Sequence, residues 1–408
     1  ATETPKALSG FRILDFSHLL QGPFATQLLA DMGADVIKVE RAGAGDLFRS
    51  MTFFAKWVGP DPDHGESPNF LAWNRNKRSI ALNLKSPRVR AIVMDMARGA
   101  DVVVQNFRPG VMDKLGYGYE DFRAVNPGIV YCSGSGYGED GPYADRPGQD
   151  MLIQGLVGVM STTGRADQPP VPVGSGFSDQ VGAMNMVYGI LSALLWRART
   201  GKGQKVEVNL QAGMMAHLNQ EYVAVLNLGE DFRRPLSGIG HPGMQAPFGV
   251  YATRDGHWIT IAMSPFRVLY ETLGAPHLAA YDDLGTLFER RDEVWEKVNE
   301  QTRRFDRDDL LARLLAADVW CAQVNDIREG AADPQARHMG MVTSYDHPRA
   351  GRVQVVAPAV RMSETPAAIT RPAPLIGQHG REILREHGLS DDEIAALEAA
   401  GDLTVQEA

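Results

Sequence analysis

Cysteine is scarce in this sequence of 408 residues, which contains two in all. Cys132 and Cys321 are too few for a disulfide framework and lack the spacing of a zinc site. The histidines are scattered along the chain without a metal-ligand rhythm. We therefore expect no metal site, and a reducing, cytoplasmic location.

Targeting segments and long apolar runs are also lacking. The first residues show no basic segment followed by an apolar run, so no signal peptide is expected. The longest apolar stretch, residues 184–196, is about 13 residues long and interrupted by polar residues, whereas a bilayer span needs about 20. The sequence therefore predicts no membrane partner.

A basic excess is absent as well, because 41 Lys and Arg residues face 50 Asp and Glu residues, giving a net charge of −9. Such a balance offers no electrostatic footprint for DNA or RNA. The apolar share of 44% suffices for a packed core. Since the chain exceeds the usual single-core limit of roughly 250–300 residues, we expect two domains or one domain with an insertion.

The first 150 residues follow an α/β pattern. A strand over 12–16, an apolar helix over 24–34 and a strand over 35–40 form a βαβ unit, which favours a parallel sheet. The alternation of strands and helices then continues to about residue 136. The pattern weakens after residue 219 and resumes near the end of the chain, which suggests a discontinuous first domain.

Four segments are predicted on this basis. Residues 1–215 form the first part of the large domain, and 216–247 are a crossing linker. Residues 248–330, with a strand pair around the turn at Arg254, Asp255 and Gly256, form a small domain. Residues 331–408 return to the large domain.

Generic catalytic motifs are missing: there is no Walker loop, no HExxH and no GxSxG elbow. Three carboxylates, Asp150, Asp167 and Asp179, lie near glycine-rich or proline-rich turns, where most aspartates are solvated or cap helices. Asp179 is the most suggestive, because it follows the small residues 174–176 and precedes an apolar helix. It is either an N-cap stabilised by backbone N–H groups or a nucleophile.

Two other patterns have ordinary and functional interpretations. The basic run 75–78 is typical of a solvated edge, yet with Lys38, Arg41 and Lys85 it could hold phosphates. The glycines of residues 134–138 miss the GxGxxG spacing, so a tight loop is favoured over a nucleotide site.

Seven stretches spread over the whole chain carry a family resemblance. They are residues 8–41, 74–87, 101–116, 126–142, 200–210, 332–342 and 371–380, beginning with LSGFRILDFSHLLQGPFATQLLADMGADVIKVER. Together and in register they resemble the family III coenzyme A transferases, which include formyl-CoA, carnitine-CoA and benzylsuccinate-CoA transferases and are related to α-methylacyl-CoA racemases.

The resemblance implies an α/β fold with a Rossmann-like large domain made from both termini and a smaller α+β domain. It also implies an interlocked dimer, with each subunit threaded through the other, formed by two identical chains or by two related ones. Coenzyme A and acyl-CoA would be substrates, and no cofactor would be bound permanently.

The same resemblance implies covalent catalysis by Asp179, through an acyl-aspartyl anhydride and an aspartyl-CoA thioester. An ordinary aspartate has a pKa near about 4, so we expect easy ionisation, with desolvation and alignment as the limiting factors. The stretch SGIGHPG matches the family's glycine loop, placing Gly238, Ile239 and Gly240 over the intermediate as N–H donors, unless it is a plain interdomain turn. Asp150 matches a glutamate near the nucleophile.

Positions that contact CoA in the family also match. They are His18, Leu19, Leu20 and Gln21 in the turn after the first strand, Arg41 near the adenosine 3′-phosphate, Leu82 and Lys85, Asn106 and Phe107 at the pantetheine, and Lys114. Lys114 stands where arginine is common, which keeps the charge but loses bidentate phosphate recognition.

Two departures bear on the reaction. Leu20 replaces the glutamine of formyl-CoA transferase, which argues against a formyl or oxalyl substrate. Gln149 stands where the racemases carry a histidine, and glutamine cannot accept the proton that racemisation requires. A transferase is therefore favoured over a racemase.

Three functional hypotheses remain. The first is transfer of CoA from an acyl-CoA, with succinyl-CoA as a candidate donor, to an organic acid. The second is racemisation or epimerisation of an acyl-CoA. The third is a partner subunit of a heteromeric transferase, against which the retained Asp179 and glycine loop argue. Aromatic residues could line a pocket for a bulky dicarboxylic acid, or belong to the core; they are Phe24, Phe48, Trp73 and Tyr137.

Overall fold

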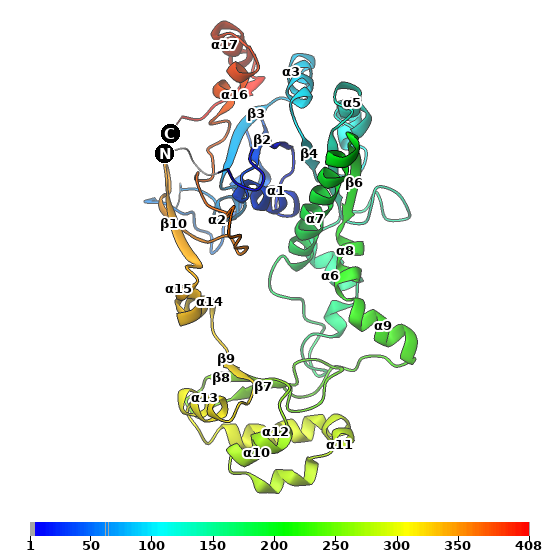
Figure 1. The fold of residues 1–408 in the computed structure, drawn as a ribbon, viewed down its shortest axis with the longest axis vertical. Coiled ribbons are helices and arrows are strands. Elements are labelled where there is room, and N and C mark those ends of the chain that lie inside the picture. Colours follow the sequence, from blue (N-terminus) through cyan, green and yellow to red (C-terminus); the bar gives the residue numbers. More distant parts are fainter. Residues whose placement is uncertain (1–4, 62, 64, 408) are drawn as a thin grey trace. The chain divides into compact units, whose positions relative to one another are not determined.

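The computed structural model describes residues 5–61, 63 and 65–407. The described chain divides into two compact units. The first contains the residues up to Ile153, then Gly176–His217, and the residues from Pro334 onwards; the second contains Gln154–Ser175 and Leu218–Asp333. The start and the end of the chain, blue and red in Figure 1, therefore belong to the same unit.

A seven-stranded sheet forms the centre of the first unit. Its strands are β1 (Arg12–Asp15), β2 (Asp35–Arg41), β3 (Lys77–Leu82), β4 (Val102–Gln105), β5 (Val130–Ser135), β6 (Gln204–Asn209) and β12 (Leu403–Thr404). The order is β12-β3-β2-β1-β4-β5-β6, and every neighbouring pair is parallel except β12 with β3. Strand order 3-2-1-4-5-6 is that of doubly wound dinucleotide-binding folds. The predicted parallel α/β sheet is confirmed.

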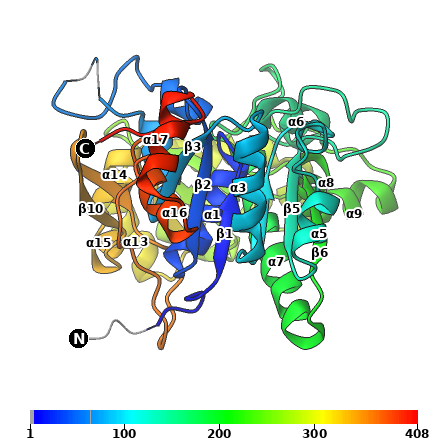
Figure 2. The ribbon, with the colours of Figure 1, turned by 90° about the horizontal axis from the view of Figure 1, so that it is seen from above.

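Helices cover both faces of this sheet (Figure 2). One face is covered by α3 (Pro87–Arg98), α5 (Tyr119–Val125), α16 (Gly380–Glu386) and α17 (Asp391–Ala399). The other is covered by α1 (Gln21–Asp31) and α7 (Phe177–Thr200). The inner strands are buried on both sides, as β4 shows with the sequence VVVQ, because parallel sheets are usually covered on both faces, whereas the edge strand β6 is largely exposed.

Shorter elements complete the first unit. They are η1 (Leu47–Ser50), α2 (Pro68–Trp73), α4 (Val111–Leu115), α8 (Leu210–His217), α15 (Pro334–His338) and the antiparallel pair β10 (Val342–His347) and β11 (Gly351–Val356). Helix α6 (Asp150–Leu156) contains the boundary between the units.

Helix α7 is longer than the apolar stretch seen in the sequence. It has 24 residues, because the small residues before Met184 continue the helix to Phe177, and it ends where Gly201 adopts φ 73°. Among the described residues it is the one helix long and apolar enough, by length and composition, to cross a membrane. The apolar stretch of residues 184–196 is therefore only part of this helix. Its buried side chains, such as Met186 and Ile190, pack on the sheet.

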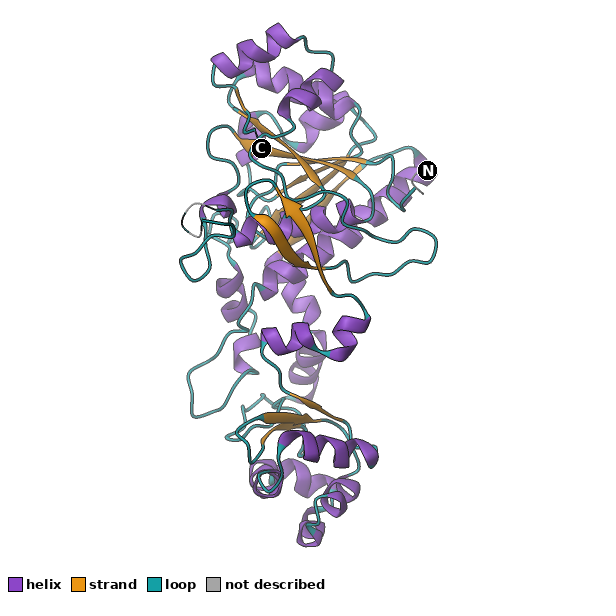
Figure 3. Ribbon diagram, turned by 90° about the vertical axis from the view of Figure 1, so that its left-hand side faces the viewer, coloured by secondary structure: helices purple, strands orange, loops and turns teal. Residues whose placement is uncertain are grey.

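The second unit contains a small antiparallel sheet with helices around it (Figure 3). Its elements are η2 (Val159–Ser161), α9 (Asn219–Leu228), β7 (Gly249–Ala252), β8 (Trp258–Ile261), α10 (Phe266–Thr272), η3 (Pro276–Tyr281), α11 (Leu284–Glu289), α12 (Arg291–Thr302), α13 (Arg307–Ala316), β9 (Cys321–Gln323) and α14 (Ile327–Ala332). The predicted strand pair is confirmed as β7 and β8.

The contact-based division differs from the predicted domain boundaries at two places. Residues 154–175, predicted within the large domain, group with the second unit. One physical reason is Arg234, whose guanidinium donates hydrogen bonds to the carbonyls of Thr163, Gln168 and Pro169. The segment predicted as a crossing linker begins with helix α9. The domain assignment as a whole stays a prediction.

Candidate active site

The predicted CoA-binding positions follow the carboxyl ends of β1, β2, β3 and β4. These ends lie at one edge of the sheet because the strands are parallel. After β1 the chain enters α1 on one face, whereas the chain after β4 leads to α5 on the other. Such a reversal between neighbouring strands is where doubly wound folds bind their ligands. His18–Gln21 and Asn106–Phe107 border this switch point.

Asn106 and Phe107 contact His18 directly. The Asn106 side chain accepts a hydrogen bond from the His18 N–H and donates one to the His18 carbonyl, both at 2.9 Å. The imidazole lies edge-on to the Phe107 ring, with 4.9 Å between centroids. Burial lowers the pKa of His18 and outweighs the carboxylate of Asp46, so the ring is neutral at pH 7.

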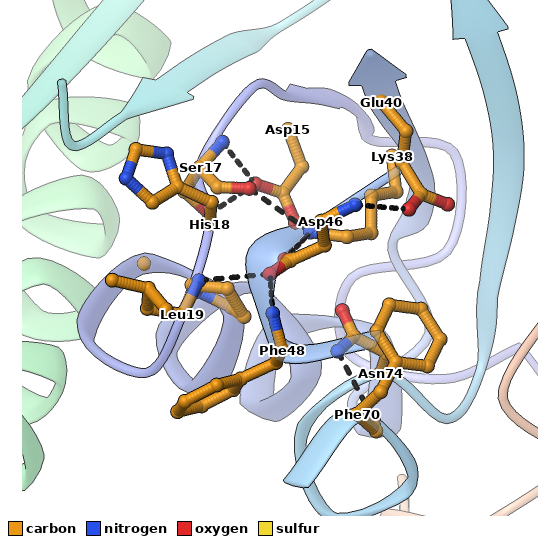
Figure 4. Close-up of polar contacts among 12 residues, drawn as sticks. Asp15, Ser17, His18, Leu19, Lys38, Glu40, Asp46, Phe48, Phe70 and Asn74 are labelled. Atoms are coloured by element: carbon orange, nitrogen blue, oxygen red, sulfur yellow. Dashed lines mark hydrogen bonds and ion pairs between the residues drawn. The ribbon is translucent and has the colours of Figure 1, made fainter. Parts of the chain in front are cut away.

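Leu19 adopts a left-handed conformation, with φ 63°. For a residue with a Cβ this costs roughly 1–2 kcal/mol. The Leu19 N–H donates a hydrogen bond of 3.1 Å to Asp46 Oδ1, which also accepts from the Phe48 N–H at 2.9 Å (Figure 4). Asp46 is thus both the N-cap of η1 and the anchor of the turn after β1.

A buried charge network lies beside this turn. The Lys38 ammonium is 2.8 Å from Asp46 Oδ2, both side chains are fully buried, and Lys38 also donates to the Ser17 carbonyl at 2.9 Å. Asp15 pairs with Lys77 at 3.0 Å. Burial opposes ionisation of Asp15, but Lys77 and Lys38 outweigh it and lower its pKa to about 2. The carboxylate therefore stays charged at neutral pH.

This network contradicts the predicted roles of Lys38 and the basic run 75–78. Arg75 pairs with Asp31, and Lys77 pairs with Asp15. Arg78 pairs with Asp35, Glu382 and Glu386 on neighbouring elements. All four cations are buried, so the run is neither a solvated edge nor a phosphate site. The physical reason is that each has a carboxylate partner within the protein: Asp46, Asp31 and Asp15 are buried, whereas the partners of Arg78 are partly exposed.

Arg41, Lys85 and Lys114 differ from those cations because they are exposed. Arg41 ends β2 and lies opposite Leu82, which ends β3, in the parallel register. Lys85 follows three residues after Leu82, at the same edge. Lys114 lies in α4, after the segment that contains Phe107.

A pocket lies at the carboxyl ends of β4 and β5. Phe107, Tyr119, Tyr131 and Ser133 are among its lining residues. It therefore borders the same edge as the His18 turn.

Asp179 lies in the first turn of α7 and is partly buried. Gly176 and Gly182, three residues before and after it, share its face of the helix. A Cβ on Gly176 would lie 2.8 Å from Leu20 Cδ1, and one on Gly182 would lie 2.8 Å from Gln21 Nε2. This face of α7 is therefore packed directly against the turn after β1, and the fold brings Asp179 to the switch point.

Asp150 is close to Asp179 as well. The N–H of Ser178, next to Asp179, donates a hydrogen bond of 2.6 Å to Asp150 Oδ1. Burial raises the pKa of Asp179 to about 7, and the charge of Asp150 adds to the effect. The expectation of easy ionisation was therefore wrong. No N–H of the described residues donates a hydrogen bond to the Asp179 carboxylate, and the neighbouring N–H of Ser178 donates to Asp150 instead.

The predicted glycine loop lies in the second unit. Its Ile239 pairs with Gly249 at the start of β7, and the Gly238 carbonyl accepts a hydrogen bond from Val250. The Gly240 N–H donates to the carbonyl of Phe248, the residue before β7, at 2.9 Å, so this N–H already has a partner in the second unit. The oxyanion role of this loop stays a prediction.

The other candidates have ordinary local contacts. Asp167 forms an exposed ion pair with Arg165 in the second unit. Phe24 packs on Trp73, with 4.6 Å between ring centroids, which favours the core interpretation for this pair. Among the described residues, no group of three or more His, Cys, Asp or Glu side chains is placed to hold a metal ion.

Sequence reasoning missed Asp15, Glu40 and Asp46. The available signal was the strand DVIKVE, where Lys38 and Glu40 interrupt an otherwise apolar run that the α/β pattern places inside the sheet. Charged residues are rarely buried without a partner. Their presence there indicates a paired internal network.

Comparisons with known proteins agree with this picture. A model of CoA-transferase family III matches residues 8–380. A mouse succinyl-CoA:glutarate CoA-transferase is 37% identical over 390 residues, which cover 94% of this chain and 87% of the relative. A formyl-CoA:oxalate CoA-transferase of Streptomyces coelicolor is 33% identical over 417 residues, covering 98% and 99%.

A solved structure is also similar. The crystal structure of a CAIB/BAIF family protein from Brucella suis aligns with a TM-score of 0.82 at 33% identity, covering 94% of this chain and 100% of that one. The family match, the relatives and the shared fold lead to one conclusion. This chain belongs to CoA-transferase family III.

Proposed function

We propose that this enzyme transfers CoA from succinyl-CoA to a carboxylic acid, with a dicarboxylic acid of the glutarate type as the acceptor class. Relatives named for the succinyl-CoA and glutarate pair, from mouse, human and Agrobacterium fabrum, are 37%, 35% and 34% identical to this chain. Leu20, which replaces the glutamine of formyl-CoA transferase, also favours this donor over formyl-CoA.

Asp179 is proposed as the nucleophile. Its carboxylate attacks the thioester carbonyl of succinyl-CoA, the C–S bond breaks, and a succinyl-aspartyl anhydride and CoA thiolate form. The thiolate then attacks the aspartyl carbonyl of the anhydride and expels succinate. An aspartyl-CoA thioester remains on the enzyme.

The second half reverses these steps with the acceptor. The acceptor carboxylate attacks the aspartyl-CoA carbonyl and releases the thiolate, which gives a second anhydride. Attack of the thiolate on the acceptor's acyl carbonyl forms the new acyl-CoA and restores the Asp179 carboxylate. No net proton transfer is needed, which agrees with Gln149 at the position of the racemase histidine.

The observation that carries this proposal is the environment of Asp179. A partly buried carboxylate beside Asp150, with a pKa raised to about 7, is poorly solvated and therefore more nucleophilic than an ordinary aspartate. The packing of Gly176 and Gly182, which flank Asp179 on α7, against Leu20 and Gln21 supports an approach of the thioester along the carboxyl edge of the sheet. Asp150 is proposed to keep the α7 N-terminus in place.

Coenzyme A is proposed to bind along the same edge as a substrate, with no permanently bound cofactor. Arg41, Lys85 and Lys114 are exposed cations on successive connections and are suited to the CoA phosphates. Phe107, whose ring lies against His18 at the end of β4, is proposed to contact the pantetheine arm.

We also propose that the active form is a dimer. Met184, Tyr188 and Leu195 of α7 are 53%, 64% and 63% exposed. They form one apolar stripe, since residues four and eleven apart lie on nearly the same side of a helix. Such a stripe is suited to packing against a second copy of this chain or a related chain.

Light scattering coupled to size-exclusion chromatography distinguishes a monomer from a homodimer. The variant Leu195→Glu should shift a homodimer to monomer.

Trapping the covalent intermediate tests the mechanism. Wild-type protein incubated with succinyl-CoA and then hydroxylamine should carry a hydroxamate on Asp179, which peptide mass spectrometry locates. Asp179→Asn should lack the adduct and lose at least about 10³-fold in kcat, because a covalent nucleophile is removed. The matched control, Asp167→Asn, alters an exposed aspartate, and it should retain both the hydroxamate adduct and the wild-type kcat. Full activity of Asp179→Asn would rule the mechanism out.

A further inference from the structure

We infer that Asp46 is a positioning residue of this enzyme, which holds Leu19 in its left-handed conformation and thereby fixes the turn between β1 and α1. The inference rests on the proposed function, because it gives this turn the task of presenting Leu20 and Gln21 to Asp179. The inference goes beyond the proposed function because it assigns a role to a buried carboxylate that contacts neither Asp179 nor the proposed substrates.

Side chains hold the main chain of this turn at every residue from Ser17 to Leu19. The Ser17 N–H donates to Asp15 at 2.9 Å, and its carbonyl accepts from Lys38 at 2.9 Å. Asn106 binds both peptide groups of His18. Leu19 is held through its N–H by Asp46. A turn fixed at so many consecutive groups is preorganised.

Leu19 is the strained member of this turn. A leucine is rarely left-handed, and such outliers persist only where the surroundings determine them. Asp46 Oδ1 is the acceptor that its N–H meets in this conformation. The same oxygen accepts from Phe48, so the turn and η1 share one anchor (Figure 4).

The anchor itself cannot move freely. Asp46 Oδ2 lies 2.8 Å from the Lys38 ammonium, and its N–H donates to Glu40 Oε2 at 2.8 Å. Glu40 in turn forms hydrogen bonds of 2.7 Å with the Arg49 guanidinium. Strand β2, the loop after it and the turn after β1 are therefore joined through fully buried charges.

A displacement of this turn would reach Asp179. Leu20 follows Leu19 and packs on Gly176, and Gln21 packs on Gly182. Both contacts lie one helical turn from Asp179, on its own face of α7. Covalent transfer tolerates little misplacement, since an error of about 1 Å can cost on the order of 10²-fold in rate.

Kinetics of Asp46 and Leu19 variants test the inference, with succinyl-CoA and glutarate as substrates. Asp46→Ala should lower kcat/KM by about 10²-fold, whereas Asp46→Asn, which keeps an acceptor oxygen but loses the charge that pairs with Lys38, should lie between Asp46→Ala and wild type. Leu19→Gly should restore about tenfold in the Asp46→Ala background, because glycine adopts the left-handed conformation without strain. A purely structural role of Asp46 would lower the melting temperature of Asp46→Ala and leave kcat/KM per folded enzyme unchanged.

A second series leaves the charged pair intact and covers the case in which Asp46→Ala does not fold. The kcat/KM of Leu19→Val should lie at least about tenfold below the values of Leu19→Asn and Leu19→Gly, because a β-branched residue resists positive φ. Equal activity of the three Leu19 variants overturns the inference, as does a folded Asp46→Ala enzyme with wild-type kcat/KM. Neither result depends on the hydroxamate experiment with Asp179. If the wild-type enzyme forms no hydroxamate on Asp179, the proposed mechanism is overturned instead.

Discussion

Asn106 clamps the main chain of His18 from both sides, accepting its N–H and donating to its carbonyl at 2.9 Å. The clamp joins the ends of β1 and β4 at the switch point. Half of the amide's hydrogen-bonding capacity is thereby used within the protein. Its predicted contact with the pantetheine is left to the second N–H of Nδ2 and to the free lone pair of Oδ1.

The first prediction concerns this clamp. Asn106→Asp keeps the acceptor but removes the donor to the His18 carbonyl and adds a charge, so kcat/KM for succinyl-CoA should fall by about 10–10²-fold. Asn106→Ala should fall at least as far. Steady-state kinetics measure both, with thermal melts as the folding check. Wild-type kcat/KM in a folded Asn106→Ala enzyme contradicts a positioning role for the clamp.

The second prediction is the pH profile. Because burial and Asp150 raise the pKa of Asp179 to about 7, kcat/KM should rise with pH and level off above about 7 as the nucleophile ionises. Asp150→Asn keeps an acceptor for Ser178 but removes the charge, so the rise should move to lower pH. A profile that is flat between pH 5 and 8, a range of about three units around this pKa, contradicts the assignment.

The third prediction concerns stability. The folded-state pKa of Asp179 is raised, so the folded protein binds this proton more tightly than the unfolded chain does. The stability contribution is therefore present at low pH and is lost as pH rises from about 4 to about 7. Asp179→Asn should consequently raise the free energy of unfolding at pH 8, on the order of 1–3 kcal/mol after solvent screening is allowed for.

Urea denaturation at pH 8 and pH 5 measures this difference. The gain from Asp179→Asn should be larger at pH 8, since the wild-type carboxylate is charged there. Asp167→Asn, which changes an exposed aspartate in an ion pair with Arg165, serves as the control and should show no such gain. A gain that is independent of pH means that the effect is packing and not ionisation.

Much of the fold follows from the sequence alone. The strands around β1, β2 and β4 and the helix between β1 and β2 lie where the apolar pattern predicts them. The C-terminal helix α17 begins directly after Ser390, whose side chain accepts a hydrogen bond from the Glu393 N–H, and a serine followed by acidic residues is a typical N-cap pattern. These features are local, and local pattern is what a single sequence records.

The charged residues were harder to predict because their partners are distant in sequence. Lys77 meets Asp15, 62 positions away, and Arg78 meets Glu386, 308 positions away. A basic run gives no sign of such partners, so burial and exposure could not be told apart. The prediction of an ordinary pKa for Asp179 failed for the same reason, because this pKa depends on Asp150 and on burial beside the turn after β1.

The fourth prediction tests CoA binding at the carboxyl edge. Arg41 is exposed at the end of β2 and matches the family position near the 3′-phosphate. Arg41→Ala should raise the KM for succinyl-CoA by about tenfold, because one charge-assisted contact is lost, and leave kcat nearly unchanged. The KM for the 3′-dephospho analogue should not change. An equal effect on both substrates means that Arg41 contacts another part of the molecule.

The last prediction separates transfer from racemisation. Gln149 is exposed just before α6 and cannot take up a proton, so this position does not supply the second acid-base group that a racemase needs. Incubation of the wild-type enzyme with 2-methylacyl-CoA in deuterium oxide should introduce no deuterium at the α carbon, while succinyl-CoA and glutarate in the same buffer should exchange CoA. Asp179→Asn should abolish the exchange. The contrary outcome is deuterium uptake by the wild-type enzyme without any acceptor acid, with no uptake by Asp179→Asn. That result would assign Asp179 to proton abstraction and overturn the transferase assignment.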